Sequence, residues 1–528
     1  MAHAASPSVS ASASQTVDVD VVVVGGGING AGIARDLAGR GLSVLLAEAQ
    51  DLAMHTSSSS SKLIHGGLRY LEFGEFGLVR KALQEREVLL KSAPHIMWPL
   101  RFVMPHDPSM RPAWLIRLGL FFYDHLARRE LLPGSRGIDL RKHEAGVPLQ
   151  ARFVQGFEYS DGWVDDARLV LLNALDARFK GAEVLTRSPV VAARRAAQHW
   201  DVTIATPRGE RQVRAGALVN AAGPWAEQFL REVAQAADGE TLATRHLRLV
   251  KGSHIVVPRC FDHAQAYIFQ NPDKRIIFAL PYEQDYTLIG TTDLEVSPET
   301  LSGRAKAQIE AQEVAYLCEQ ASRYFRRPVL PEQVVWSYAG VRPLLDDESG
   351  NPSAVTRDYL LETQQQGAPL LTVWGGKITT FRKLAQDAAD EVCRMLRRRA
   401  PAWTSGAFLP GGDWSAWTGA PSGSPQDQFD HFEHFVQQVQ QRYAFLPLAL
   451  ARRLARQHGA RVAEVLAGVA SRADLGQEVA PGLFEAELRY LQREEWACSA
   501  DDVLWRRTKL GLRLTPAERE AVAAWWTK

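Results

Sequence analysis

The stretch that most constrains the fold is residues 19–48, VDVVVVGGGINGAGIARDLAGRGLSVLLAE. Residues 21–24 are four valines that end at a glycine, a pattern typical of a buried parallel strand. Residues 31–39 have the composition of a helix with small residues on its packing side, and residues 43–47 indicate a second strand. A strand, a helix and a strand in this order predict an α/β fold with a parallel sheet.

Gly25, Gly27 and Gly30 give the spacing G-x-G-x-x-G directly after the first strand. The first glycine permits a tight turn, the second lets the backbone approach a pyrophosphate, and the third lets the helix pack on the strand. Glu48 follows about 20 residues later, where an acid binds the ribose hydroxyls of a dinucleotide. Its carboxylate would repel a 2′-phosphate, which disfavours NADP but does not separate NAD from FAD. We therefore predict a dinucleotide site.

The composition limits the number of domains and the classes of partner that the chain can have. The chain has 528 residues, 46% of them hydrophobic and 23% charged, which is enough for two or three globular domains. Lys and Arg number 61 against 60 Asp and Glu, so the overall charge does not favour nucleic-acid binding. The four cysteines are far apart and form no C-x-x-C pair. This argues against a zinc site or a disulfide framework and fits a reducing cytosol.

Changes in composition divide the chain into regions. Residues 1–16 are Ala/Ser-rich and lack the features of a secretory signal, so we expect a disordered tail. We expect residues 17–400 to form the dinucleotide-binding region, with an inserted antiparallel sheet at about 245–340 where strand patterns replace the parallel start. Residues 401–425, rich in Gly, Pro, Ser and Trp, are the expected linker to a helical domain at 426–528.

Three further turns carry polar residues suited to a ligand. Residues 57–61 are five serines, followed by Lys62 and by glycines, which suits a loop laid against phosphate or a polar ring better than a surface linker. A small-residue turn at Gly223 and a strand–turn–helix at residues 370–384 repeat the opening pattern. We therefore assign cofactor contacts to Ser57, Lys62, Gly223, Gly376, Lys377 and Thr379.

Residues 99–132 contain an unusual apolar helix pattern that starts near Pro112. An apolar face with basic edges is typical of a helix lying in a membrane interface, but it also fits a core helix with snorkelling arginines. The sequence leaves both interpretations open. The apolar residues at helical spacing are Trp114, Leu118, Phe121, Phe122 and Leu126, and the flanking basic residues are Arg111, Arg117, Arg128 and Arg129.

From residue 19 to about 511 the chain resembles the FAD-dependent glycerol-3-phosphate dehydrogenases, most of all the aerobic, respiratory bacterial type. Besides the opening stretch, the blocks that carry the resemblance are TSSSSSKLIHGGLRYLE, FEYSDGWVDDARLV, LVNAAGPWA, KGSHIVVPR, LIGTTD, YAGVRPL, GGKITTFRKLA and DDVLWRRTKLG. The resemblance implies a D-amino-acid-oxidase-type, Rossmann-like FAD domain, an antiparallel-sheet substrate region and a helical C-terminal domain. It also implies FAD, ubiquinone or menaquinone as acceptor, and peripheral attachment to the inner, cytoplasmic face of the cytoplasmic membrane. We also expect a homodimer.

Oxidation of the secondary alcohol of sn-glycerol 3-phosphate to dihydroxyacetone phosphate needs a base, a hydride acceptor and a phosphate clamp. Arg69, Tyr70, Arg342 and Lys377 are the expected phosphate ligands, because arginine and lysine suit a dianion. His65 and His254 are both candidates for the base. The alternatives are a glycerol-3-phosphate oxidase that uses oxygen and a flavin amine or amino-acid oxidase.

Overall fold

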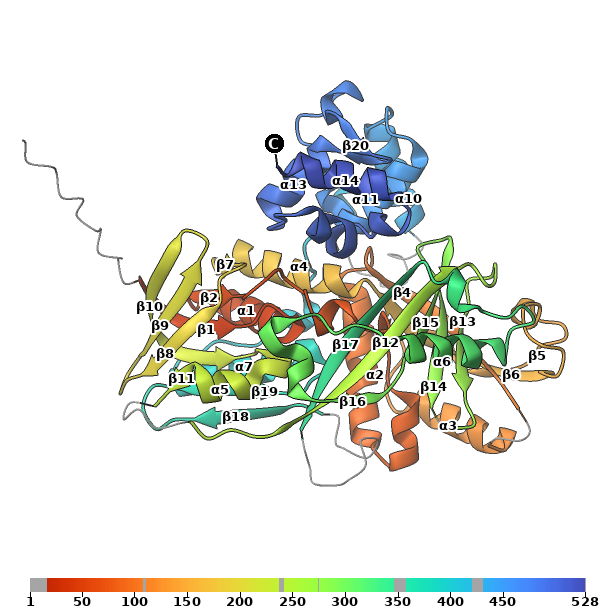
Figure 1. Cartoon of the computed structure of the whole chain (residues 1–528), viewed down its shortest axis with the longest axis horizontal. Helices are drawn as coiled ribbons and strands as arrows, with labels where there is room; N and C mark the ends of the chain where they lie inside the picture. The colour runs from red at the N-terminus through yellow and green to blue at the C-terminus, as the bar shows by residue number, and fades with distance from the viewer. Residues whose placement is uncertain are drawn as a thin grey trace, which may run out of the picture.

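The computed structural model describes residues 17–107, 111–236, 242–273, 275–345, 358–419 and 431–527. The predicted tail at 1–16 and part of the predicted linker, residues 420–425, lie outside these ranges. Two sheets lie side by side, and a helical C-terminal domain sits above them (Figure 1).

The first sheet is built on the predicted strand–helix–strand unit. Strand β1 (Val17–Val24) pairs in parallel with β2 (Val44–Ala47) and with β10 (Gly209–Asn220). The central order is β11-β8-β9-β10-β1-β2-β7, with β19 beside β10 and β18 beside β19. The remaining strands are β7 (Glu183–Leu185), β8 (Val190–Arg195), β9 (Trp200–Thr206), β11 (Ala234–Gln235), β18 (Leu360–Gln364) and β19 (Leu370–Trp374).

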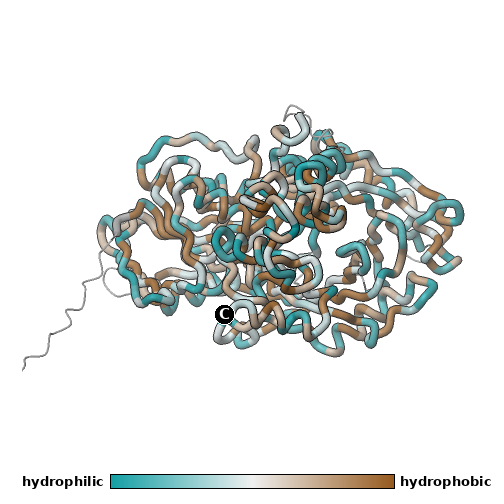
Figure 2. The backbone as a smooth tube through the Cα atoms, turned by 90° about the horizontal axis from the view of Figure 1, so that it is seen from above, coloured by the Kyte–Doolittle hydropathy of each residue, from teal (hydrophilic) through white to brown (hydrophobic). Residues whose placement is uncertain are grey.

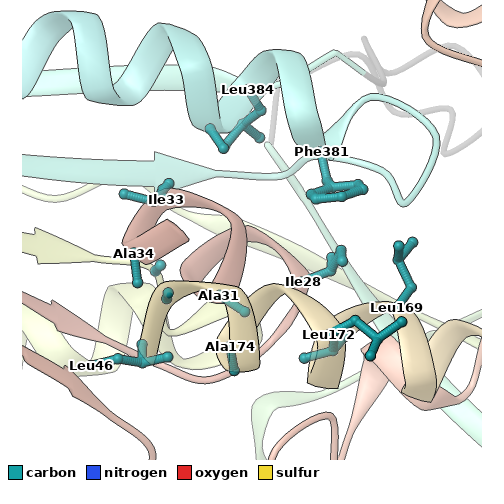
Figure 3. Packing of buried hydrophobic residues seen from close by; sticks show 14 of the residues in the cluster. Ile28, Ala31, Ile33, Ala34, Leu46, Leu169, Leu172, Ala174, Phe381 and Leu384 are labelled. Carbon is teal, nitrogen blue, oxygen red and sulfur yellow. The ribbon is translucent and has the colours of Figure 1, made fainter. Parts of the chain in front are cut away.

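Helix α1 (Ile28–Gly39) packs against both α4 (Asp166–Phe179) and α7 (Phe381–Met395), as Figure 3 shows. Small residues on α1 permit the close approach: a Cβ on Gly32 would lie 2.9 Å from the ring of Phe381. The cluster between these helices and the sheet is fully buried and apolar, so hydrophobic burial holds the turn at the start of α1 in place. Its labelled members in Figure 3 include Ile28, Ala31, Leu46, Leu172, Phe381 and Leu384.

The second sheet has the order β16-β12-β15-β14-β13-β4-β6-β3, with β17 beside β12 and β5 beside β6. Among the residues that the structure describes, neighbouring strands of this sheet pair in antiparallel fashion, except that β13 pairs in parallel with β4. The sheet expected at about 245–340 is thus larger, because strands from residues 63–164 pair with it. Its strands are β3 (Leu63–Ile64), β4 (Met97–Pro105), β5 (Arg136–Asp139), β6 (Gln155–Val164), β12 (Leu247–Pro258), β13 (Ala266–Gln270), β14 (Ile276–Tyr282), β15 (Tyr286–Gly290), β16 (Leu294–Val296) and β17 (Trp336–Leu345).

Further helices lie against these sheets and the loops beside them: α2 (Phe76–Ser92), α3 (Ala113–His125), α5 (Ala226–Glu232) and α6 (Ala311–Ser322). Helix α3 begins after Pro112, as predicted. Only Leu120 and Tyr123 of α3 are buried, whereas Trp114 is 68% and Phe121 50% exposed. The core-helix interpretation is therefore wrong for the apolar face of α3. Among the described residues, no helix has the length and apolar character to cross a bilayer.

The C-terminal domain has its own apolar core, which includes Trp414, Phe435, Leu454 and Leu488. Figure 2 shows, from above, hydrophilic and hydrophobic residues interspersed along the backbone. In the C-terminal domain, helices such as the one at 448–458 bury one face only, as expected of amphipathic helices around a core. Its elements are α8 (Ser415–Thr418), α10 (Phe432–Arg442), α11 (Leu448–His458), α12 (Val462–Val465), β20 (Glu478–Ala480), β21 (Leu483–Phe484), α13 (Glu485–Glu494), the π-helical turn η10 (Asp502–Arg507) and α14 (Pro516–Trp525).

Candidate active site

A cavity of about 600 Å³ is lined by residues of both sheets and of the loops that join them. It brings together most of the residues that the sequence pointed to, although they come from segments far apart in the chain. The predicted site residues that line it are Gly25, Gly27, Glu48, Ser57, His65, Tyr70, Gly223, His254, Arg342, Gly376, Lys377 and Thr379. Gly30, Lys62 and Arg69 are not among the lining residues.

The glycine turn is compact because side chains there would collide with neighbouring backbone. Gly25 has φ of +105°, and a Cβ on it would lie 2.5 Å from the carbonyl oxygen of Ala221. A Cβ on Gly30 would lie 1.9 Å from the carbonyl oxygen of Gly25. Gly30 therefore acts by letting α1 begin against the strand rather than by lining the cavity. The open backbone beside the N-terminus of α1 suits a pyrophosphate.

Glu48 is fixed at the same end of the cavity. Its Oε2 accepts a hydrogen bond from the amide of Gly26 at 2.6 Å, and its Oε1 accepts one from the amide of Gln50 at 2.7 Å. Burial raises the pKa of the Glu48 carboxyl. Ser57 Oγ accepts from the amide of Ile28 at 3.0 Å, so this hydroxyl holds the serine loop against the start of α1.

Lys62 and Arg69 are placed differently from the other predicted residues. The ammonium of Lys62 is buried and donates to Ser58 O and to Asp166 Oδ2, each at 2.7 Å. These acceptors hold it behind the wall of the cavity, because a buried charge needs a partner of its own. Arg69 is half-buried in η2 (Leu68–Phe73), outside the cavity lining.

Two cations line the cavity, Arg342 from β17 of the second sheet and Lys377 from the turn after β19 of the first sheet. Arg342 of β17 donates from Nη2 to Asp293 Oδ1 at 2.5 Å. Its guanidinium lies over the backbone of β12, where a Cβ on Gly252 would come within 3.1 Å of Nη2. The Nζ of Lys377 lies 4.1 Å from the centroid of the Tyr70 ring, in a cation–π contact. The cavity therefore offers positive charge to an anion.

Both candidate bases have ring environments that favour the neutral form. The Nε2 of His254 is 2.8 Å from Ser61 Oγ, and burial lowers the pKa of His254 well below 6.5. Burial also lowers the pKa of His65, whose amide donates to Thr379 Oγ1 at 3.1 Å. A neutral imidazole accepts a proton, so either histidine is in the correct state for a base.

The sequence interpretation missed Ser61, Asp293 and Tyr338 as members of this site. Each lies within a block that was singled out: the serine run, LIGTTD and YAGVRPL. Their position in these blocks indicated that they lie near the site. Their contacts with His254 and Arg342 join different segments of the chain, so only the folded structure reveals them.

Comparison with known proteins agrees with this geometry. Residues 20–382 match the family described as FAD dependent oxidoreductase, and residues 402–525 match the C-terminal domain of alpha-glycerophosphate oxidase. The fold, the glycine turn and this match define an FAD-dependent oxidoreductase, which confirms the predicted cofactor.

The chain is 50% identical over 500 residues to a glycerol-3-phosphate dehydrogenase of Pseudomonas aeruginosa, covering 94% of this chain and 93% of the relative. It is 48% identical over 510 residues to the aerobic glycerol-3-phosphate dehydrogenase of Escherichia coli, covering 96% of each. It therefore belongs to the glycerol-3-phosphate dehydrogenase family, as the motifs indicated.

Two further similarities bear on substrate and fold. A protein of Brucella abortus named D-erythritol 1-phosphate dehydrogenase is 50% identical over 508 residues, covering 96% of this chain and 97% of that one. The structure of a glycerol-3-phosphate dehydrogenase from Bacillus halodurans, complexed with FAD, is similar with a TM-score of 0.75 at 27% identity, covering 97% of this chain and 90% of that one. The expected fold class is confirmed.

Proposed function

We propose that this protein oxidises sn-glycerol 3-phosphate to dihydroxyacetone phosphate and delivers the electrons to a membrane quinone. The observation that carries the proposal is the shared cavity: Arg342, Lys377 and His254 line the same space as the glycine turn. When bound, FAD supplies a two-electron acceptor for the C2 hydride. The protein side chains must bind the phosphate, orient C2 and take the hydroxyl proton.

Arg342 and Lys377 are the proposed phosphate clamp. Arginine pairs with phosphate through two parallel hydrogen bonds, and lysine adds a second charge. Asp293 holds the Arg342 guanidinium in the cavity, and the ring of Tyr70 orients the Lys377 ammonium. Arg69 stands outside the cavity lining, so its proposed contribution to phosphate binding acts from the neighbouring loop.

A neutral histidine takes the proton of the C2 hydroxyl in this proposal. His254 is the first candidate because its ring is held by Ser61, by the stacked ring of Tyr338 and by close packing on Gly290. His65, which lines the same cavity, is the second candidate. Either histidine passes the proton on after the oxidised product leaves.

The direct test is anaerobic addition of sn-glycerol 3-phosphate to the purified holoenzyme while the flavin absorbance is followed. We expect the yellow colour to bleach within the enzyme's turnover time. An enzyme that stays fully oxidised with saturating substrate would refute the proposed reaction. Glycine and other small amino acids serve as the matched panel for an amine or amino-acid oxidase, and we expect no bleaching with them.

A second candidate substrate is a four-carbon polyol phosphate. The relative named D-erythritol 1-phosphate dehydrogenase is 50% identical to this chain, the same identity as that of the glycerol-3-phosphate dehydrogenase of Pseudomonas aeruginosa. Both substrates present a phosphate and a neighbouring secondary alcohol, so one clamp serves either. We expect a higher kcat/KM for sn-glycerol 3-phosphate, and the reverse order would reassign the substrate.

The proposed acceptor is ubiquinone or menaquinone rather than oxygen. Turnover with a soluble quinone analogue should be much faster than oxygen consumption, with little hydrogen peroxide. Stoichiometric peroxide formation in air would instead show the oxidase alternative.

We also propose a peripheral contact with the inner face of the cytoplasmic membrane, made by α3. Its Trp114, Phe121 and Phe122 are exposed, and the Phe122 ring meets the exposed Phe76 of α2 with centroids 5.9 Å apart. An exposed apolar surface with basic residues at its edges suits an anionic lipid interface. The proposed homodimer is tested separately by light scattering of the detergent-free protein.

A further inference from the structure

The C-terminal domain holds the loop at the dinucleotide end of the cavity through buried ion pairs with Asp51. In η10, Arg506 Nε donates to Asp51 Oδ2 at 2.6 Å. Arg507 donates from Nη1 to Asp51 Oδ2 at 2.5 Å and from Nη2 to Oδ1 at 2.8 Å. Asp51 is 1%, Arg506 3% and Arg507 2% exposed, so solvent screens none of these charges appreciably.

Asp51 belongs to the loop 48–54 that follows β2 and surrounds the glycine turn. Glu48 accepts from the amide of Gly26, and the amide of Ala53 donates to Gly26 O at 3.2 Å. A Cβ on Gly26 would lie 2.8 Å from both Glu48 Cβ and Leu52 Cδ2. The loop and the turn are therefore in van der Waals contact, and a shift of the loop changes the space left for the dinucleotide.

The same turn of the C-terminal domain holds the loop from a second side. Arg187 donates its amide to Gln50 O at 2.7 Å and its Nη2 to Asp502 Oδ2 at 2.5 Å. Asp502 also accepts from Arg506 Nη2 through Oδ1 at 2.5 Å. The loop is thus connected to η10 both through Asp51 and through Arg187.

The buried ion pairs disfavour separation of Asp51 from η10. Although burial raises the pKa of a carboxyl, Arg507 and Arg506 lower the pKa of Asp51 to about 2, so it is ionised at physiological pH. Moving Asp51 away would leave the buried Arg507 guanidinium with a backbone carbonyl, that of Glu495, in place of its carboxylate partner, whereas Arg506 would keep Asp501 and Asp502. Separating a buried charge from its carboxylate is costly. The loop 48–54 consequently has its position fixed by the domain that begins about 350 residues later.

We propose that Arg506 and Arg507 are positioning residues for FAD: docking of the C-terminal domain holds the loop 48–54 in the shape that retains the cofactor. Because binding free energies are linked reciprocally, bound FAD also stabilises the docked domain. The inference depends on FAD as the cofactor and not on the identity of the substrate, so it can fail while the proposed reaction stands.

The test measures the rate at which the holoenzyme releases FAD after dilution, from the rise in free-flavin fluorescence. Arg506→Lys and Arg507→Lys keep the charge but lose the multiple contacts with Asp51. We expect each to speed FAD release about tenfold, a coupling of ordinary size. Arg187→Lys, at the more exposed second connection, should give a smaller increase, and it keeps the test open if Arg507→Lys does not fold.

Arg168→Lys is the matched control. Arg168 of α4 forms an equally buried, two-bond ion pair with the side chain of Glu495 of the C-terminal domain, at 2.5 and 3.1 Å. The backbone carbonyl of Glu495 accepts from Arg507, so the control perturbs a neighbouring charge pair while leaving Asp51 and the loop 48–54 their own contacts. We expect this variant to lower the denaturation midpoint while FAD release stays at the wild-type rate. Unchanged release in Arg506→Lys and Arg507→Lys, or equally fast release in Arg168→Lys, would overturn the proposal.

Discussion

The imidazole of His254 stacks on the ring of Tyr338, with ring centroids 4.8 Å apart and planes 16° from parallel. The pairing of β12 with β17 puts the two residues directly opposite each other. A stacked aromatic ring on one side and Gly290 on the other leave the imidazole little freedom, because a Cβ on Gly290 would lie 2.1 Å from His254 Cδ2. The strand register thus presents one fixed, neutral imidazole to the cavity.

The first prediction concerns this imidazole. His254→Gln should lower kcat by about 100-fold or more, the usual size of general-base catalysis, with FAD content unchanged. Because burial lowers the pKa of His254 well below 6.5, the neutral base persists into mild acid, and wild-type kcat/KM should decline only well below pH 6.5. The matched variant is His65→Gln. A large decrease of kcat in His65→Gln, with little change of kcat in His254→Gln, would identify His65 as the base instead.

The second prediction concerns the phosphate clamp. Arg342→Ala removes charge-assisted hydrogen bonds worth about 1.5–3 kcal/mol each, so KM should rise about 10- to 100-fold while FAD binding is kept. Asp293→Asn keeps the guanidinium but weakens its support, and its effect on KM should be smaller. Unchanged affinity for sn-glycerol 3-phosphate in Arg342→Ala, measured by anaerobic flavin titration, would contradict the clamp.

The third prediction concerns the glycine turn. Gly30→Ala puts a methyl group 1.9 Å from the carbonyl oxygen of Gly25, so the start of α1 must move and FAD should be lost on purification. Gly77→Ala is the control, since its Cβ meets nothing within 4 Å and it lies in helix α2. That substitution should keep FAD and add about 0.5–1 kcal/mol of stability. A yellow Gly30→Ala protein would disprove the role given to this glycine.

The fourth prediction tests the exposed face of α3. Phe121→Glu with Phe122→Glu should strongly reduce co-sedimentation with vesicles that contain anionic lipid, because it replaces exposed apolar surface by charge. Phe179→Glu is the control, since Phe179 is also 50% exposed but lies at the end of α4. Equal loss of binding in both proteins, or no loss in either, would remove α3 from the membrane contact.

The fifth prediction concerns acid stability. His95 is fully buried, neither ring nitrogen has a hydrogen-bond partner among the described residues, and burial lowers its pKa well below 6.5. Below about pH 6.5, His95 therefore binds a proton in the unfolded chain but not in the folded chain. The free energy of unfolding consequently falls as the pH falls. His95→Leu removes the imidazole that binds this proton in the unfolded chain. Its denaturation midpoint should fall less between pH 7.5 and pH 5 than that of the wild type, and an identical fall would exclude His95 as a source of acid sensitivity.

Much of the site followed from local patterns. Gly25, Gly27 and Glu48 were predicted as cofactor residues, and the fold places all three on the cavity. Lys62 had the same kind of signal, a cation within a polar loop, but its ammonium pairs with Asp166 behind the cavity wall. The direction of the Lys62 side chain depends on its buried acceptor, Asp166, which lies 104 positions later in the chain and could not be inferred from the local pattern.

The dinucleotide half of this protein follows from the sequence, because its turn, helix and acid lie within 30 consecutive residues whose geometry is set by local sterics and hydrogen bonding. The stacking of His254 on Tyr338, the choice of cations that reach the cavity and the contact of Arg506 with Asp51, 455 positions away, required the folded chain. These contacts depend on sheet register and domain docking, where burial of charge selects a partner irrespective of its distance along the chain.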